Sequence, residues 1–206
     1  MIRAEENRLI LSDQNNSIGK LFLKNERTLV NFLLEGLRQN FFDYVFNEAS
    51  DLESFFLGAK RGIYSLLNNL VENYLDGNQL KKESLVKLTR HGENNKDVSY
   101  EELIIDFPVE FAIFDLNSAF HDGIFEKFQF TQNQKDEFAR GICLASHMTT
   151  FFIFVIFRYE IFQDFTFNRI IKDYKQKNVY LIYPKMMKEL ALSRTKRFGG
   201  HFILSN

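Results

Sequence analysis

The chain contains no tryptophan, only two prolines and only one cysteine among its 206 residues, and each scarcity excludes something. Because Cys143 is alone, no internal disulfide can form, which is typical of a reducing compartment. Because only Pro108 and Pro184 can interrupt a helix, long helices are favoured. Residues 1–14 are too polar and acidic for a signal peptide, and we therefore expect a cytoplasmic protein.

Hydrophobic residues, and phenylalanine above all, are abundant instead. Hydrophobic residues make up 45% of the chain, and 24 of its residues are phenylalanine. A chain of this length is typical of one domain, and it has enough apolar surface to bury a core. We therefore predict a single domain over residues 1–206 with a phenylalanine-rich core.

Helix-start signals recur along the chain. The capping-box pattern, Ser or Thr followed three residues later by Glu or Gln, appears at 50–53, 99–102 and 131–134. We expect a helix from each start, and the third helix should run to about residue 162. Pro108 should end or bend the second helix. Asn25 predicts a further helix start ahead of these three.

Weaker β signals lie near both ends of the chain. Leu9–Leu11 and Leu21–Leu23 flank turn residues and predict an N-terminal hairpin. Val179–Tyr183 is the best strand candidate, and Gly199-Gly200 predicts a two-residue hairpin turn after it. The fold class predicted from all these signals is mainly α. It is a helical bundle of about five to seven helices with a minor β element, formed by the N-terminal hairpin and the C-terminal strand and hairpin.

Residues 141–157 contain no Asp, Glu, Lys or Arg. A transmembrane helix needs roughly 20 apolar residues. Because this run is shorter and includes His147 and Thr149, a membrane span is the weaker interpretation. We favour a helix at the centre of the bundle, surrounded on all sides. In that position six side chains should be largely buried: Phe151, Phe152, Phe154, Val155, Ile156 and Phe157.

Charge is divided unevenly along the chain, although the net charge is only −1. Residues 1–157 hold 16 Lys/Arg and 23 Asp/Glu, whereas residues 158–206 hold 10 Lys/Arg and 4 Asp/Glu. Nine of the acidic residues fall within 93–126. Such a charge distribution can steer a charged partner, but the acidic and basic parts can equally attract each other within the fold.

The basic C-terminal part predicts a subdomain at 168–204 in the order helix, strand, helix and hairpin, which is compatible with a winged-helix-like unit. The second helix would span 185–192, and the next residues would form the wing. Five residues would contact phosphates or an acidic partner: Lys185 and Lys188 on the helix, and Arg194, Lys196 and Arg197 on the wing. The alternative is a hairpin that closes the core and leaves these side chains solvated.

Arg140 and His147 form an R-x6-H pair, and at about 100° per residue they lie on nearly the same helix face. The pair resembles the R-x4–6-H motif of HEPN ribonucleases, which are helical bundles. The resemblance implies a homodimer that cleaves RNA, with His147 in acid–base catalysis and Arg140 on the phosphate. It covers these two residues alone, and Gly141 stands where that family often has a polar residue.

Two other groupings are weaker as catalytic or metal sites. Cys143 and His147 are spaced as a nucleophile and its base could be, but a buried structural cysteine is the favoured interpretation. Acidic and histidine side chains that could ligate a metal gather in one region, namely Asp115, His121, Asp122 and Glu126. They lack the Glu-x-x-His spacing of di-iron bundles, so we predict no metal and no cofactor.

The sequence therefore favours a non-enzymatic binding or regulatory protein that docks on a nucleic acid or a nucleoprotein machine. Its partner would be a larger protein or ribonucleoprotein, with RNA as a candidate and a membrane disfavoured. A small, charge-polarised chain without catalytic motifs suits an inhibitor of host defence such as phages and mobile elements carry. The alternatives are the HEPN-like ribonuclease and a membrane-associated helical protein.

Overall fold

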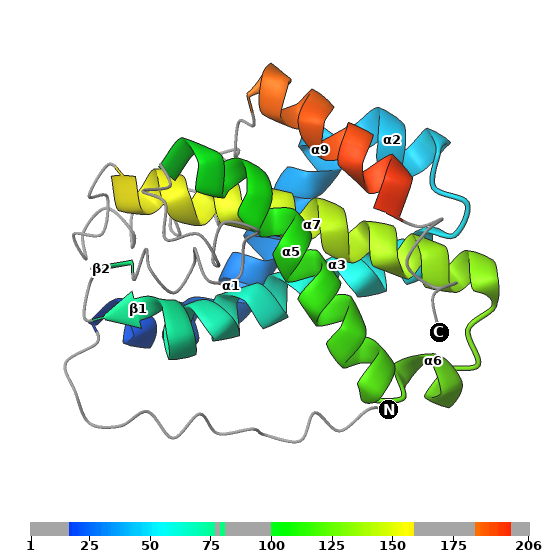
Figure 1. Cartoon of the computed structure of the whole chain (residues 1–206), viewed down its shortest axis with the longest axis horizontal. Coiled ribbons are helices and arrows are strands. Elements are labelled where there is room, and N and C mark those ends of the chain that lie inside the picture. The colour runs from blue at the N-terminus through cyan, green and yellow to red at the C-terminus, as the bar shows by residue number, and fades with distance from the viewer. Residues whose placement is uncertain (1–16, 77–78, 81–99, 159–183, 199–206) are drawn as a thin grey trace.

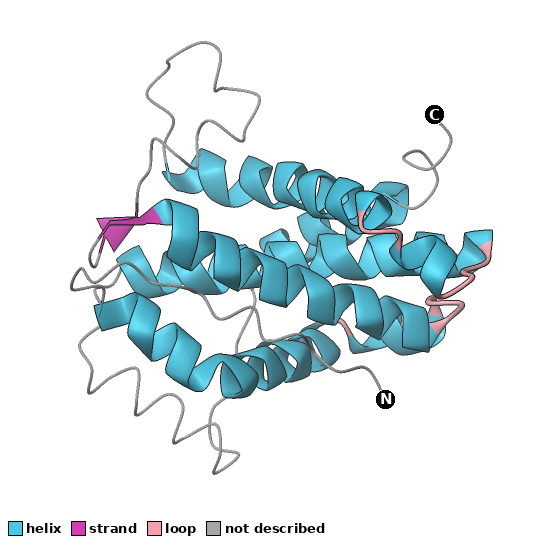
Figure 2. Ribbon diagram, turned by 90° about the horizontal axis from the view of Figure 1, so that it is seen from below, coloured by secondary structure: helices cyan, strands magenta, loops and turns pink. Residues whose placement is uncertain are grey.

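A computed structural model describes residues 17–76, 79–80, 100–158 and 184–198. Within these ranges the chain is mainly helical (Figures 1 and 2), as predicted. The α-helices are α1 (Ser17–Asn40), α2 (Phe42–Asn47), α3 (Leu52–Asn69), α5 (Tyr100–His121), α6 (Ile124–Lys127), α7 (Gln132–Arg158) and α9 (Lys185–Phe198). The π-helix η1 (Leu70–Tyr74) continues α3 and leads into a two-residue antiparallel ladder of β1 (Leu75–Asp76) and β2 (Gln79–Leu80).

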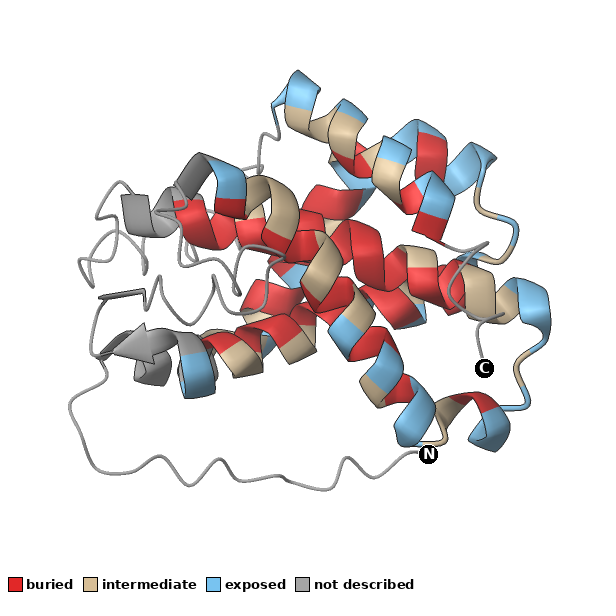
Figure 3. Ribbon diagram, viewed as in Figure 1, coloured by how far each residue is buried: buried red, intermediate tan, exposed pale blue. Residues whose placement is uncertain are grey.

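The helix α7 lies at the centre of the bundle and packs against α1, α3, α5 and α9. Every residue from Gly141 to Thr150 is buried, and Figure 3 shows this stretch surrounded by the other helices. Phe152 and Phe154 are buried as predicted, and Phe151 is half-buried, whereas the side chains of 155–157 lie outside the described part. The predicted central helix is therefore confirmed. None of the described helices combines the length and the apolar character needed to cross a membrane.

The predicted capping box starts α7. The backbone N–H of Thr131 donates to Oε1 of Gln134 at 3.0 Å, and the backbone N–H of Gln134 donates to Oγ1 of Thr131 at 3.3 Å. At α3 the cap is Asp51 rather than Ser50, because the Asp51 carboxylate accepts from the backbone N–H of Ser54 at 2.9 Å. This hydrogen bond lowers the pKa of Asp51.

Three expectations about local structure are wrong. Asn25 does not start a helix but lies inside α1, which begins at Ser17. Leu21–Leu23 also lies inside α1; a short apolar run fits a strand or a helix, and the buried residues that follow it have helical spacing. Pro108, expected to end or bend its helix, does not end α5, which continues to His121. The segment 193–197, expected as a wing, forms the last turns of α9. The other candidates lie outside the described residues, namely Leu9–Leu11, 168–177, Val179–Tyr183 and Gly199-Gly200.

The helices α3 and α7 cross at glycines. A Cβ added at Gly58 would lie 2.0 Å from the carbonyl oxygen of Phe138, and one added at Gly141 would lie 2.0 Å from the carbonyl oxygen of Phe55. At Gly62 the nearest atom to an added Cβ is 3.1 Å away. The two backbones therefore approach so closely that Gly58 and Gly141 leave no room for a side chain.

Candidate functional site

The C-terminal helix α9 carries all five basic residues that the sequence singled out, and it is anchored by its inner face. Ala191, Thr195 and Phe198 are buried, and their spacing of three and four residues turns one side of α9 toward the bundle. The Thr195 hydroxyl lies 3.7 Å from Sγ of Cys143 on α7. The opposite side of α9 faces solvent, as Figure 3 shows.

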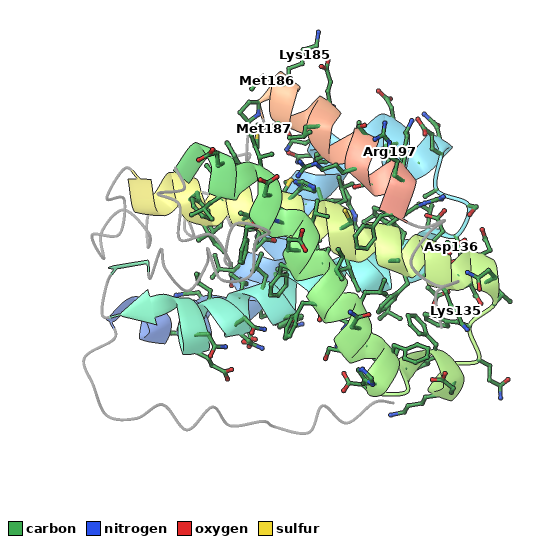
Figure 4. All side chains as sticks on the ribbon, in the orientation of Figure 1. Lys135, Asp136, Lys185, Met186, Met187 and Arg197 are labelled. Carbon is green, nitrogen blue, oxygen red and sulfur yellow. The ribbon has the colours of Figure 1, made fainter. Side chains whose placement is uncertain are left out.

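The outward face of α9 is basic at both of its ends. The side chains of Lys185 and Lys196 are 89% and 51% exposed, and Arg197 is exposed beside Lys196. Figure 4 shows Lys185 and Arg197 at opposite ends of the helix. Oε1 of Glu189, which is 67% exposed, lies 3.9 Å from Nζ of Lys185. The outward face therefore presents an exposed ion pair at its first turn and exposed positive side chains at its last turn.

Part of this positive charge is engaged within the chain. The Nζ of Lys196 lies 2.6 Å from Oε2 of Glu48 and 5.8 Å from the centre of the Tyr44 ring. The Nζ of Lys188 lies 5.7 Å from the centre of the Phe41 ring. Such exposed contacts contribute little to stability and are screened by salt. An anionic partner could therefore replace them at small cost.

Arg194 is not part of the outward face, because it joins α9 to α5. Its Nη1 donates to the carbonyl oxygen of Ile105, and its Nη2 lies 3.4 Å from Oδ1 of Asp106. Arg194 therefore supplies a charged donor to the backbone of α5, three residues before Pro108. We conclude that Arg194 positions α9, whereas the sequence had suggested that it contacts a partner.

Replacing Arg194 should destabilise the fold. Arg194→Ala removes a charge-assisted hydrogen bond to a backbone carbonyl that is partly buried, and we expect a loss of about 1.5 kcal/mol in the free energy of unfolding. Arg197→Ala is the matched control on the exposed side, and its effect should stay within about 0.5 kcal/mol. Denaturant unfolding followed by circular dichroism measures both changes. Equal losses for the two variants would contradict the positioning role.

His147 lies beneath α9, one helical turn from Cys143, and only 1% of it is exposed. Burial, aided by the positive charge of Arg194, lowers the pKa of His147 to about 3. Burial also raises the pKa of the Cys143 thiol to about 12. At neutral pH both groups are therefore uncharged, and neither reaches the surface where a substrate could bind.

Arg140 belongs to a different cluster, between the start of α7 and the turn before α3. Its Nη1 donates to Oε1 of the fully buried Glu137 at 2.7 Å. The Ser50 hydroxyl lies 2.8 Å from Oδ1 of Asn133 and 3.0 Å from the same Glu137 oxygen. Burial raises the pKa of Tyr44 here, and the charge of Arg140 opposes that rise. The structure therefore gives Arg140 and His147 separate surroundings rather than one shared site.

Two acidic side chains, one in α5 and one directly after it, neutralise a basic residue of α3. The Nε of Arg61 lies 3.2 Å from Oδ1 of the buried Asp115, and its Nη2 lies 3.1 Å from Oδ2 of Asp122. Burial raises the pKa of Asp115, and the charge of Arg61 only partly opposes that rise.

Across the described residues, no group of three or more His, Cys, Asp or Glu side chains is placed to hold a metal.

Two carboxylates outside the predicted site hold α9, because Asp106 pairs with Arg194 and Glu48 pairs with Lys196. Asp106 is one of the nine acidic residues within 93–126, so its pairing with the basic part agrees with the alternative that the two parts attract each other. The particular partner had no local signal, since Asp106 is 88 positions away from Arg194 along the chain.

Comparisons with protein-family models, with curated proteins and with solved structures found no match to this chain.

Proposed function

We propose that this chain is a non-enzymatic binding protein that docks on a larger, negatively charged partner through the outward face of α9. The partner would be a nucleic acid or the nucleic-acid-bearing face of a nucleoprotein. The observation that carries the proposal is the position of Lys185, Lys196 and Arg197 on one anchored, solvent-facing helix. Basic side chains held on a rigid helix can neutralise phosphates and release counterions.

The proposal divides the five basic residues into two roles. Lys185, Lys196 and Arg197 would contact the partner, with Lys188 at the flank of the same face. Arg194 would act indirectly, because its contacts with α5 hold the helix in place. A charge reversal at Arg194 would therefore disturb the fold and could not serve as a test of binding.

Charge reversal on the outward face should weaken binding. The variant Lys185→Glu/Arg197→Glu changes two exposed side chains that support little of the fold. With a fluorescent single-stranded RNA in an anisotropy titration, we expect affinity to fall at least about tenfold. The dependence of log K on log salt should become shallower by about 0.7 for each phosphate that the variant no longer neutralises.

Lys60→Glu/Lys127→Glu is the matched control, because both lysines are exposed on other helices. It changes the net charge by the same amount and should weaken binding less than the α9 variant. Equal weakening by both variants would show a non-specific charge effect and remove the α9 face from the proposal. Failure of the wild type to bind RNA, single-stranded DNA or duplex DNA would exclude a free nucleic acid as the partner.

One form of this proposal is a regulator that inhibits its partner stoichiometrically. Phages and mobile elements direct such inhibitors against host defence. This form of the proposal requires a nucleoprotein partner rather than free RNA. Affinity capture from the native host with and without nuclease treatment separates the two cases. Capture that survives nuclease and disappears in the α9 variant would favour a protein surface.

A further inference from the structure

Four phenylalanine rings form a connected group from the end of α5, through α6, to the segment before α7. They are Phe120, Phe125, Phe128 and Phe130, called here the α6 aromatic cluster. The centre of the Phe125 ring lies 6.5 Å from that of Phe120 and 5.9 Å from that of Phe130. The ring centres of Phe128 and Phe130 are also 5.9 Å apart. Phe125 is buried, whereas Phe120 and Phe128 are 46% and 42% exposed, so the cluster reaches the surface at two rings.

Backbone hydrogen bonds at the end of α6 hold part of this cluster together. The N–H of Phe130 donates to the carbonyl oxygen of Phe125 at 3.0 Å, and the N–H of Gln129 donates to the carbonyl oxygen of Glu126 at 3.1 Å. These two bonds form a Schellman motif, in which the residue after the helix cap is left-handed. Gln129 adopts that conformation, with a φ of 51°. The motif therefore fixes Phe130 against Phe125.

The last turn of α9 lies at the same place. Phe198 is buried in a hydrophobic cluster that also contains Phe125 and Phe138, and Phe130 packs against that cluster. The ring of Phe138 on α7 lies with its centre 5.5 Å from that of Phe125. Ala191, two helical turns before Phe198, belongs instead to the main core of the bundle. The helix α9 therefore runs from the main core toward the α6 aromatic cluster, and the chain leaves α9 beside it.

The sequence that follows Phe198 suits a segment that returns onto this cluster. Gly199 and Gly200 permit backbone conformations that other residues avoid, so the chain can change direction there. Residues 202–204 then form an apolar run, Phe-Ile-Leu. At about 3.3 Å per extended residue, this run can reach about 13–20 Å from Phe198. Neighbouring rings of the cluster are only 5.9–6.5 Å apart, so its exposed rings are within reach.

The area of the exposed rings favours a tethered occupant over a second copy of the chain. Phe120 and Phe128 together expose less than one whole phenylalanine, which is on the order of 200 Å². A stable interface between two molecules needs about 800 Å² from each of them. A segment of the same chain needs less, because its tether removes most of the cost of bringing two molecules together.

We propose that residues 201–204 dock on the α6 aromatic cluster and cover its exposed rings. The segment would act as a strap that ties the last turn of α9 to α6. Because Lys196 and Arg197 lie on that turn, the strap would also fix the position of two exposed basic side chains. The proposal does not depend on what α9 binds, since it concerns a contact within one chain.

A single tryptophan in the segment tests the proposal, because the chain has none of its own. Phe202→Trp should emit at a shorter wavelength in the folded protein than in denaturant, since docking removes the indole from water. Adding Phe120→Ser/Phe128→Ser should shift this emission toward that of the unfolded chain. Adding Phe42→Ser/Phe46→Ser is the matched control, because those rings are 57% and 43% exposed on α2, and it should leave the emission unchanged.

Three results of the fluorescence experiment would overturn the proposal. Emission of folded Phe202→Trp at the wavelength of the unfolded chain would show that the segment stays in water. Equal shifts in the two double-serine backgrounds would place the segment elsewhere on the bundle. Emission that changes with protein concentration would show that a second copy, and not the same chain, covers the tryptophan.

Disulfide trapping tests the contact without the double-serine variants, so it stands even if one of them fails to fold. Cys143 is fully buried with a raised thiol pKa, so the introduced cysteines should be the reactive ones. Phe128→Cys/Ile203→Cys should form an intramolecular disulfide under mild oxidation, because docking brings the two Cβ atoms toward the roughly 4 Å that the bond requires. Phe46→Cys/Ile203→Cys is the matched control and should form far less. Equal trapping of the two pairs, or none between residues 128 and 203, would contradict the proposal.

Discussion

Gly141→Ala should lower the free energy of unfolding by more than about 3 kcal/mol, enough to unfold a protein of ordinary stability. The added Cβ would lie 2.0 Å from the carbonyl oxygen of Phe55 and 2.8 Å from the backbone nitrogen of Ala59. Both atoms belong to backbone, so no change of rotamer relieves the contact. The helices α3 and α7 would have to separate, and the helix preference of alanine over glycine, about 1 kcal/mol, is too small to offset this.

Gly62→Ala is the graded control for this prediction. Its Cβ would lie 3.1 Å from the carbonyl oxygen of Ile142, which requires a shift of only a few tenths of an ångström. We therefore expect a change within about 1 kcal/mol, because the gain in helix preference opposes the strain. Denaturant midpoints with circular dichroism compare the two variants. A loss at Gly62 as large as that at Gly141 would show that the distance of approach does not govern stability here.

The same contact explains where the chain departs from the HEPN motif. That family often has a polar residue directly after its arginine, and any side chain at position 141 would collide with the α3 backbone. Arg140 is bonded to Glu137, and His147 is buried and neutral near pH 7. The two residues of the R-x6-H pair therefore lie in separate surroundings on the central helix, and RNA cleavage by this pair stays a prediction that His147→Ala would test.

The parts of the fold that could be predicted are those that local chemistry determines. The capping box at Thr131 and Gln134 and the uncharged run that follows it both depend on neighbours in the sequence. The close approach of α7 at Gly58 and Gly62 was not predicted, because which helix approaches these glycines depends on the topology of the bundle and not on any local pattern.

The candidate site was harder to predict because it depends on contacts between distant segments. Five basic residues near the C-terminus suggested one outward patch, but α9 turns Arg194 inward, where it contacts Ile105 and Asp106. In the same way Arg61 meets Asp115 and Asp122 across two helices. Part of the charge asymmetry along the sequence is therefore neutralised inside the fold, and of the five basic residues singled out, Lys185, Lys196 and Arg197 stay exposed.

The stability of the protein should fall as the solution is made mildly acidic, because of His147. In the folded state its pKa is lowered to about 3 from an ordinary value of 6.5, since the side chain is buried near Arg194. Below pH 6.5 the unfolded chain binds a proton that the folded protein does not bind until about pH 3. The free energy of unfolding should therefore fall with pH across this window, and the loss due to His147 should reach about 2 kcal/mol at pH 5.

The contribution of His147 can be separated from those of the carboxylates by comparing variants between pH 7 and pH 5, where ordinary carboxylates are still largely ionised. His147→Gln removes the titrating group and should flatten the fall in the free energy of unfolding, whatever its effect at pH 7. His121→Gln is the matched control, because His121 is exposed at the end of α5, and it should keep the wild-type slope. If His147→Gln and His121→Gln gave the same slope of the free energy of unfolding against pH, the prediction would be wrong. That result would show that the burial of His147 does not limit its protonation.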